Sequence, residues 1–437
     1  MSVSVAIIGS GPAGFYTADA LVNSGIDVTI DFIERLPTPF GLIRGGVAPD
    51  HQTTKNVARK YEKTALLDFV RYYGNVEVGR DISLEELRGV YDAVVLAIGA
   101  PKDRKMNIPG EDKIGVFGSA DFVGWYNGHP DFRDLDPDLN IKAAAVIGVG
   151  NVAIDVARLL VRSREELATA DITDYAEEAI CNSPLEDVYI FGRRGPVEAK
   201  FTNVELREMG KLQQSVPVVD PEQLPDEIGD LPDREKRLKE KNLETLKEFA
   251  QCKPDEKSKR VHFGFYVSPV EVLGGDRVEG LRMERTRVEG GRAVGSGEFF
   301  DVPCGLVVAA IGYRSDPLHG APFDDRQGIV PNDDGRVDDG LYAVGWIKRG
   351  PTGVISSNRP DGVTVAEHIH RDFGDGGQGG KPGREGLETL LKERNVRPVS
   401  YADWKTIEAA EFENADGEHP RKKFVTIQAM LDVLDHT

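Results

Sequence analysis

The stretch V-A-I-I-G-S-G-P-A-G at residues 5–14 determines how the first part of this chain folds. The apolar run Val5–Ile8 predicts a buried strand, and the glycine pattern after it predicts a turn into a helix. In such a turn Gly9 permits the tight bend, Gly11 lets a pyrophosphate approach the backbone, and Gly14 lets the helix pack close to the sheet. The helix N-terminus offers free N–H groups and a positive dipole end to that pyrophosphate.

A second strand and an acidic residue complete this unit. Val28–Ile33 predicts the strand, and Glu34 ends it. This is about 20 residues past the last glycine, where a carboxylate holds a ribose hydroxyl of an adenine dinucleotide. A glycine turn without a ligand is the alternative, but strand, glycines, helix, strand and acid in this order favour a dinucleotide site.

The same signature occurs a second time. Ala143–Ile147 predicts a strand, and G-V-G-N-V-A places Gly148, Gly150 and Ala153 at the three glycine positions, where alanine is an accepted third residue. A helix is predicted over Ile154–Arg162. Two signatures indicate two dinucleotides, whereas a duplicated copy that binds nothing is the alternative.

The two units differ at the residue that reads the ribose. The predicted strand Val188–Phe191 runs into G-R-R-G-P, so Arg193 and Arg194 stand where the first unit has Glu34. Arginines suit a 2′-phosphate by charge and by bidentate geometry. The pair therefore favours NADP over NAD, with FAD in the first unit. A solvated arginine pair at the end of a strand is the alternative.

Composition describes an ordinary soluble protein of about two domains. The chain has 437 residues, of which 40% are hydrophobic and 29% charged. Its net charge of −19 argues against nucleic acid and anionic membrane as main partners. The sequence contains no apolar run of about 18 residues, so no membrane span is predicted, and the first residues lead directly into a strand without a leader.

The three cysteines, Cys181, Cys252 and Cys304, are far apart in the sequence. No C-x-x-C pair predicts a dithiol centre or a thiolate-held zinc or iron–sulfur site, and no metal site is predicted. We interpret the cysteines as structural and the compartment as cytoplasmic.

Three other segments carry predictions. Asn75–Val78 predicts a short strand, and Phe201–Met209 a helix with Thr202 as its cap and Glu205 as the capping-box partner. Asp233–Phe249 predicts a helix rich in basic residues. A solvated, salt-bridged face is one interpretation of that helix, and a docking site for an acidic partner is the other.

Several segments resemble one known family, the adrenodoxin reductase-type ferredoxin–NADP⁺ reductases, which are glutathione reductase-like flavoproteins. The similarity runs nearly end to end and in order. The segments that carry it are L-P-T-P-F-G-L-I-R-G-G-V-A-P-D-H (36–51), S-A-D-F-V-G-W-Y-N-G-H-P-D (119–131), G-V-G-N-V-A-I-D (148–155), G-R-R-G-P (192–196), F-T-N-V-E-L-R-E (201–208), V-G-W-I-K-R-G-P-T-G-V-I (344–355) and the tail around Trp404.

The resemblance implies an α/β protein with two Rossmann-like dinucleotide-binding domains. An FAD domain would be formed by residues 1–101 and 320–437, with an NADP domain, residues 102–319, inserted into it. NADPH would pass a hydride to flavin N5, and the flavin would give single electrons to a separate ferredoxin that carries the iron–sulfur cluster. Arg234 and Arg237 would dock that acidic protein.

The resemblance also implies roles for single residues. Those on the adenine and pyrophosphate side of FAD would be Ala13, Glu34, Leu42 and Val78. Those on the isoalloxazine side would be Trp346, Gly353, Val354 and Ile355. NADPH would contact the 148–152 turn (with Asn151 and Val152), Arg193, Arg194, Glu205 and Gly353.

Three polar residues are implied near the flavin or the nicotinamide, where they would tune proton and electron transfer: His51, Asp155 and Glu208. Each has a simpler interpretation. His51 could cap a helix, Asp155 could bond to backbone, and Glu208 could lie in a surface ion pair.

The chain also departs from the family pattern. It has Phe40 where many members have tryptophan, and it has Glu198 and Lys200 where members often have uncharged residues, so its coenzyme affinity is expected to differ. Three alternative functions compete with this one. An amidotransferase subunit would need a cysteine-rich cluster domain that the sequence lacks, a flavin oxidase would use a small acceptor, and a non-catalytic flavin scaffold would have no use for Arg193 and Arg194. The downstream enzyme and the direction of electron flow are not encoded in recognisable motifs.

Overall fold

The computed structural model describes residues 2–374 and 380–436, and the chain divides into two compact units. The first unit consists of the chain up to Lys102, Asn127–Pro130 and the chain from Tyr313 onward. The second consists of Asp103–Tyr126 and Asp131–Gly312. Within the described residues, we find no helix that is both long and apolar enough to cross a lipid bilayer.

The first unit is built on a six-stranded sheet in the order β16-β17-β4-β1-β2-β3. The pairings from β17 to β3 are parallel, and β16 adds antiparallel at one edge. The strands are β1 (Val3–Ile8), β2 (Val28–Ile33), β3 (Val70–Tyr73), β4 (Ala93–Leu96), β16 (Arg336–Asp338) and β17 (Leu341–Ala343). Every residue of β1 is buried, as expected for the central strand of a sheet covered on both faces.

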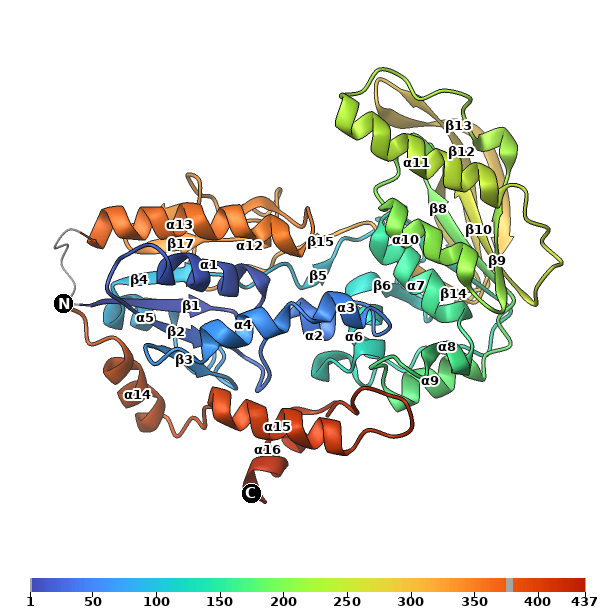
Figure 1. The fold of residues 1–437 in the computed structure, drawn as a ribbon. Helices are drawn as coiled ribbons and strands as arrows, with labels where there is room; N and C mark the ends of the chain where they lie inside the picture. Colours follow the sequence, from blue (N-terminus) through green and yellow to red (C-terminus); the bar gives the residue numbers. More distant parts are fainter. Residues whose placement is uncertain (1, 375–379, 437) are drawn as a thin grey trace. The chain divides into compact units, whose positions relative to one another are not determined.

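Helices cover both faces of this sheet (Figure 1). Alternate residues of β1 point to opposite sides. Val5 and Ile7 belong to a core with helices that include α1 (Pro12–Val22), α4 (Ala58–Ala65), α13 (Asn358–Phe373) and α15 (Tyr401–Glu413). Ala6 and Ile8 belong to a second core with α5 (Leu84–Val90) and α14 (Arg384–Glu393). The unit is a three-layer arrangement whose sheet needs strands from both ends of the chain.

The predicted strand at Asn75–Val78 is wrong. The strand is β3, whose residues V-R-Y-Y lie just before it. Asn75 has a positive φ of 58° and its N–H donates to Leu36 O, so the chain turns there instead of extending. Val78 lies in the following loop and forms a single bridge with Ile82.

The second unit contains a six-stranded sheet in the order β6-β14-β7-β8-β10-β9, with all neighbours parallel. Its strands are β6 (Val116–Gly118), β7 (Ala143–Ile147), β8 (Asp187–Gly192), β9 (Ser215–Val219), β10 (Lys259–Phe265) and β14 (Leu306–Ala309). One face packs against helices that include α7 (Asn151–Val161), α10 (Asn203–Glu208) and α11 (Asp233–Phe249).

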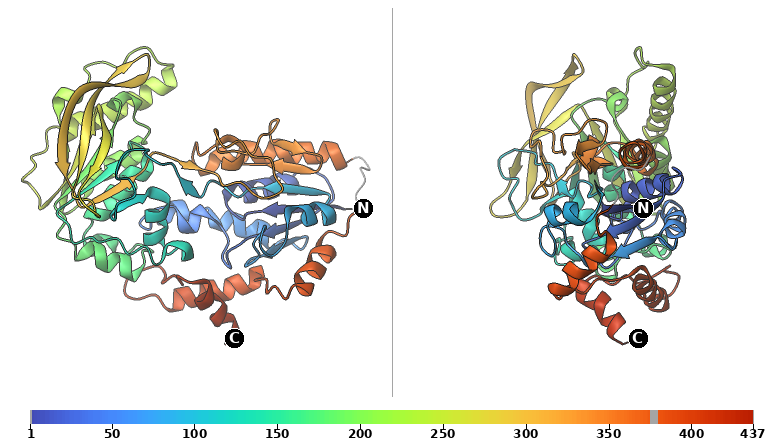
Figure 2. Two further views of the ribbon diagram at one scale, coloured as in Figure 1. Left: turned by 180° about the vertical axis from the view of Figure 1, so that it is seen from behind. Right: turned by 90° about the vertical axis from the view of Figure 1, so that its left-hand side faces the viewer.

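The other face of this sheet is covered by a three-stranded antiparallel sheet (Figure 2). Its strands are β11 (Val267–Leu273), β12 (Gly280–Glu289) and β13 (Arg292–Pro303). Leu281 and Met283 of β12 pack against Ile147 and Phe191 from the ends of β7 and β8. The antiparallel sheet therefore supports the edge at which the second glycine turn lies.

The chain changes unit at positions that side-chain contacts explain. Ser315 is fully buried, and its Oγ donates to the carbonyl of Gly99 at 2.9 Å, so the chain has returned to the first unit by this point instead of at the predicted residue 320. Asn127–Pro130 also belongs to the first unit, because Lys423 Nζ donates to the carbonyl of Asn127 at 3.0 Å.

Asp103, the first residue of the second unit, gives a prediction about pH and stability. Its carboxylate accepts hydrogen bonds from Ala120 N (2.8 Å) and Ser119 Oγ (3.1 Å) at the start of α6 (Ser119–Asn127). Burial raises the pKa of Asp103 from 3.8 to about 6. The stability that its neutral form contributes is thus complete below about pH 4 and is lost as the pH rises through 6.

We therefore expect Asp103→Asn, which keeps an acceptor oxygen without the charge, to stabilise the second unit by about 2 kcal/mol at pH 8 and by much less at pH 4.5. Urea unfolding at the two pH values measures this. Asp255→Asn, at an exposed position, is the control and should show no such difference. An equal effect of Asp103→Asn at both pH values would contradict the prediction.

Candidate functional site

The first glycine turn joins β1 to α1. Gly9 has a φ of +100°, and a side chain there would lie 2.6 Å from the carbonyl oxygen of Ala97. Gly14 brings α1 against the strand, because an added Cβ would lie 2.3 Å from Gly9 O. Gly11 is the N-cap of α1, with no acidic residue in the first turn and no side-chain cap from the described residues. The N–H groups of this helix end can thus receive an anion.

The loop at residues 36–41, which contains Pro37 and Pro39, lies directly on this turn. Phe40 N donates to Ser10 O at 3.0 Å, and a side chain on Gly41 would lie 3.0 Å from the Cα of Gly11. Phe40 adopts a φ of +81°, which is rare for a residue other than glycine. Its ring is buried and packs against Phe15, Tyr61 and Trp404. Phe40 is therefore a core residue that anchors the loop.

Glu34 lies at the carboxyl end of β2, beside the turn. Its carboxylate accepts from Ser10 N (3.0 Å), Ser10 Oγ (2.8 Å) and Leu36 N (3.2 Å). Ser10, buried between two glycines of the motif, was not among the predicted residues, although its place inside the turn is visible in the sequence. It holds the carboxylate where a ribose joined to a pyrophosphate at α1 would lie.

The predicted flavin-side residues approach α1 from the C-terminal half of the chain. A Cβ on Gly345 would lie 2.6 Å from the Cβ of Ala13, so the start of α12 (Trp346–Arg349) adjoins the start of α1. Trp346 Nε1 donates to Thr352 O at 3.2 Å, which ties the indole to the loop before Gly353.

Two apolar side chains near the first glycine turn are exposed, and this bears on whether the predicted residues fit a flavin nucleotide. Leu42 is 47% exposed and Val354 is 57% exposed. Ordinary folding buries residues of this type. Leu42 and Val354 lie in segments that adjoin the glycine turn and the Glu34 carboxylate. Exposed apolar side chains in this position suit a large apolar ligand with a phosphate end, so the residues fit FAD. Val78 instead packs, half-buried, against the core on the other face of the sheet.

The second glycine turn joins β7 to α7. Gly148 has a φ of +134°, and a side chain there would lie 2.1 Å from Ala310 O. Gly150 is the N-cap of α7, and an added Cβ on it would meet no atom within 4 Å. Asn151 Oδ1 accepts from Thr202 N at 2.8 Å, and Val152 packs, half-buried, against the core. Open space at an uncapped helix N-terminus suits a pyrophosphate.

The arginine pair follows directly beside this turn. Gly148 N donates to Phe191 O at 2.8 Å, so β8 ends level with the glycines. The carbonyl of Arg193 accepts from Thr286 Oγ1 of β12 at 2.8 Å, and the carbonyl of Arg194 accepts from Tyr266 N at 3.2 Å. Hydrogen bonds from β12 and from the residue before β11 thus fix the backbone of the pair, while the Arg193 side chain remains exposed.

Comparison with known proteins agrees with this geometry. Residues 3–187 match the family model of pyridine nucleotide-disulphide oxidoreductases. Human mitochondrial NADPH:adrenodoxin oxidoreductase is 43% identical over 452 residues, covering 99% of this chain and 92% of that protein. NADPH-ferredoxin reductase FprA of Mycobacterium tuberculosis is 39% identical, with 98% of each covered. A structure of M. tuberculosis FprA in complex with NADPH has a TM-score of 0.95 at 38% identity, covering 99% of both chains.

The chain belongs to the adrenodoxin reductase-type ferredoxin–NADP⁺ reductase family. Membership confirms the predicted resemblance and the fold class of two Rossmann-like units. It also confirms the predicted cofactors, FAD and NADP, and the predicted transfer of electrons between NADPH and an iron–sulfur carrier. The roles predicted for single residues stay predictions.

In this adrenodoxin reductase-type chain, a buried arginine of the second unit lies close to three acidic side chains. Arg158 of α7 is fully buried, and its Nη1 lies 2.8 Å from Asp155, 3.5 Å from Glu205 and 3.0 Å from Glu208. Asp155 and Glu208, two of the three residues predicted to tune the reaction, thus lie close to Glu205, which is predicted to contact NADP. Arg158 itself was not predicted, although the Asp155–Arg158 spacing of three residues on a helix is a visible ion-pair signal.

The predicted capping box of α10 is only half formed. Thr202 Oγ1 accepts from Glu205 N at 3.5 Å, but Thr202 N donates to Asn151 instead of to the Glu205 carboxylate. The carboxylate of Glu205 turns to Arg158. Similarly, Glu208 pairs with a buried arginine, so its ion pair is not a surface one.

His51 lies half-buried in the first unit at the N-cap of α3 (Gln52–Lys55). Its backbone carbonyl accepts from Thr54 N (3.1 Å) and Lys55 N (3.3 Å), whereas its side chain makes no capping bond. The helix-capping alternative therefore uses the backbone of His51 and not its imidazole.

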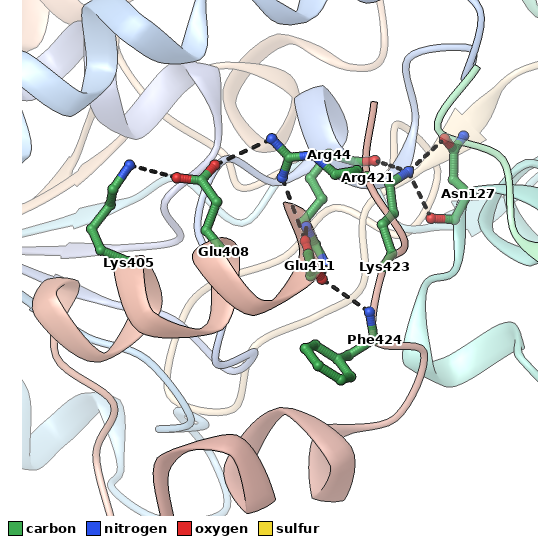
Figure 3. A network of polar contacts seen from close by, with 8 residues as sticks. All are labelled: Arg44, Asn127, Lys405, Glu408, Glu411, Arg421, Lys423 and Phe424. Carbon is green, nitrogen blue, oxygen red and sulfur yellow. Dashed lines mark hydrogen bonds and ion pairs between the residues drawn. The ribbon is translucent and has the colours of Figure 1, made fainter. Parts of the chain in front are cut away.

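A polar network braces the helix that carries Leu42 (Figure 3). Arg44 of α2 (Leu42–Gly45) forms a two-point ion pair with Glu411 of α15, whose carboxylate is fully buried. Glu411 also accepts from Phe424 N at 3.0 Å and from Arg421 at 3.4 Å. The last part of the chain thus positions a segment of the candidate FAD site.

Proposed function

We propose that this chain is a ferredoxin–NADP⁺ reductase, that is, an FAD-dependent oxidoreductase that transfers electrons between NADPH and a separate ferredoxin-type iron–sulfur protein. The observation that carries the proposal is the contrast between the two glycine turns. Glu34 stands beside the first, and Arg193 and Arg194 follow the second. A carboxylate suits the free ribose of FAD, whereas two guanidinium groups suit the 2′-phosphate of NADPH.

In the first unit, FAD would be held along its whole length. The N-terminus of α1 would bind the pyrophosphate and Glu34 the ribose, and Leu42, Trp346 and Val354 would line the apolar ring. Bound FAD supplies the conversion between hydride transfer and single-electron transfer. The protein's own contribution is to orient the ring and exclude water from the apolar side chains around it.

In the second unit, the N-terminus of α7 would bind the coenzyme pyrophosphate, and Arg193 and Arg194 the 2′-phosphate. We propose that Asp155, Glu205 and Glu208, held by Arg158, present carboxylate oxygens at fixed positions to the nicotinamide end. For His51 we propose that the imidazole serves as a proton-holding group near the flavin.

An anaerobic mixing experiment tests this function. The purified holoenzyme is mixed with NADPH or NADH, and the flavin absorbance is followed with and without a ferredoxin and cytochrome c. Fast bleaching by NADPH and ferredoxin-dependent reduction of cytochrome c are expected. Equal bleaching by NADH would contradict the role of the arginines. Cytochrome c reduction without ferredoxin would favour an oxidase with a small acceptor, and no bleaching by either coenzyme would leave a non-catalytic flavin-binding protein.

We further propose that the ferredoxin docks at the N-terminal half of α11, where the side chains of Arg234 and Arg237 are exposed. Reversing both charges, Arg234→Glu/Arg237→Glu, is expected to raise the KM for an acidic ferredoxin about tenfold at low ionic strength, because steering by opposite charges is lost. The effect should shrink in high salt. Stopped-flow or steady-state assays with ferredoxin measure it.

Ferricyanide reduction by the same variant is the internal control and should not change, since a small acceptor needs no docking surface. Lys392→Glu, an exposed charge reversal on α14, is the matched control. If Lys392→Glu weakened the ferredoxin reaction as much as the double variant, the effect would be one of net charge and the docking site would be refuted.

We propose that the protein is located in the cytoplasm, as predicted from the sequence. Cell fractionation tests this location.

A further inference from the structure

Two lysines of the second unit, Lys200 and Lys239, lie beside the second glycine turn. The proposed role of Arg193 and Arg194 does not explain why they are there. Lys200 N and Phe201 N both donate to the carbonyl of Val149, at 2.8 and 3.2 Å. Val149 lies between Gly148 and Gly150 of the turn, and its side chain also contacts Gly192, where an added Cβ would meet Val149 Cγ1 at 2.7 Å. The segments that carry Arg193 and Lys200 therefore contact the same residue of the glycine turn.

Lys239 reaches this place from α11. Its Nζ donates to the carbonyl of Ala199, the residue before Lys200. Burial lowers the pKa of Lys239, and the charges of Arg194 and Lys200 act on it in the same direction, while Glu235 and Glu198 oppose them. The hydrogen bonds of Lys239 Nζ to Ala199 and of Lys200 N to Val149 place both lysines beside the glycine turn. Lys239 thus belongs to the coenzyme side of the basic helix and not to its exposed docking face.

The neighbourhood of Lys239 is rich in cations. Its cations are Arg193 and Arg194, which follow β8, together with Lys200 and Lys239, and the carboxylates of Glu198 and Glu235 also act on Lys239. The Glu198 carboxylate is engaged by Gly195 N at 3.0 Å. A group of several cations suits the charge of about −1.5 to −2 of a phosphate monoester. Lys200 is exposed, so its ammonium is able to reach a ligand.

We propose that Lys200 is a third direct ligand of the coenzyme 2′-phosphate and that Lys239 is a positioning residue, which fixes the Lys200 segment through Ala199. This proposal rests on the proposed function of Arg193 and Arg194 and extends it. It makes selection for NADPH in this chain the work of a cation cluster drawn from three segments, β8 and its turn, residues 199–201 and α11.

Binding titrations test the proposal. We compare the affinity of the FAD-loaded protein for NADP⁺ and NAD⁺ by calorimetry, for the parent and for Lys200→Met, which removes the charge and keeps the length. One charged contact at a partly exposed site predicts a loss of about five- to tenfold for NADP⁺ and an unchanged affinity for NAD⁺. Lys200→Arg should restore NADP⁺ binding, and Lys253→Met, an exposed lysine elsewhere in the unit, should have no effect.

Two results would overturn the proposal. NADP⁺ affinity that does not change in Lys200→Met shows that Lys200 is not a ligand, and equal losses for NADP⁺ and NAD⁺ show that the lysine acts on the turn and not on the phosphate. Arg193→Ser separates this failure from that of the proposed function. If Arg193→Ser weakens NADP⁺ alone, the arginine site stands whatever Lys200 does, and if it does not, the 2′-phosphate site itself is misplaced.

Discussion

Replacing Arg193 and Arg194 together with serine is expected to weaken NADP⁺ binding by about 100-fold while NAD⁺ binding changes by less than about twofold. Each guanidinium offers charge-assisted hydrogen bonds to a phosphate, worth about 1.5–3 kcal/mol apiece before screening by water. The pair stands at a turn whose backbone β12 already fixes through Thr286. Its loss should therefore remove affinity without disturbing the fold.

Calorimetry with both coenzymes measures this, and the rate of flavin reduction by NADPH and NADH should follow the same ratio. Lysine in place of both arginines keeps the charge but not the planar fork, so an intermediate loss is expected. Arg277→Ser, an exposed arginine of the same unit, is the control. Unchanged selectivity in the double serine variant would place the 2′-phosphate elsewhere.

Arg158→Met is expected to destabilise the second unit by about 3–5 kcal/mol, because three carboxylates lose a buried cation that they share. Methionine fills similar volume, so most of the cost is electrostatic. Denaturant unfolding of the second unit measures the loss. Arg207→Met removes an exposed arginine from α10, next to Glu208, and should change stability by less than about 0.5 kcal/mol.

The pH dependence separates this cause from simple loss of packing. Without Arg158, the clustered carboxylates repel one another in the folded state, and protonation relieves this repulsion. Stability is then retained at low pH and lost as the pH rises. The deficit of Arg158→Met relative to the parent should thus be smaller at pH 5 than at pH 8. A deficit that does not vary with pH would indicate a cavity effect instead.

The sequence pattern correctly predicted the elements whose bounds depend on nearby residues. The strands Val28–Ile33 and Ala143–Ile147 and the helix Asp233–Phe249 have the predicted bounds, because apolar residues dominate each strand and the helix begins directly after Pro232. The sequence pattern did not predict features that depend on a contact with a residue far away in the sequence. Asn127–Pro130 joins the first unit through Lys423, and no property of residues near Asn127 reveals this.

The candidate site shows the same division. The glycine turns, Glu34 and the arginine pair follow from motifs with a known mechanism. Ser10, Arg158 and Lys239 do not, because their importance lies in which atom they face after folding. Arg158 in particular looks like a surface residue of an amphipathic helix until the three carboxylates are seen around it.

The interrupted first unit has a consequence for biosynthesis. Its β4 pairs with β17, its α1 packs against α13, and its Arg44 binds Glu411, so each early element awaits a partner translated much later. The residues of the second unit, by contrast, all precede Tyr313. On the ribosome, the half-made sheet emerges with the edge of β4 open to wrong partners until residue 343 has been synthesised. The part of the protein that is translated first is therefore the part that finishes folding last.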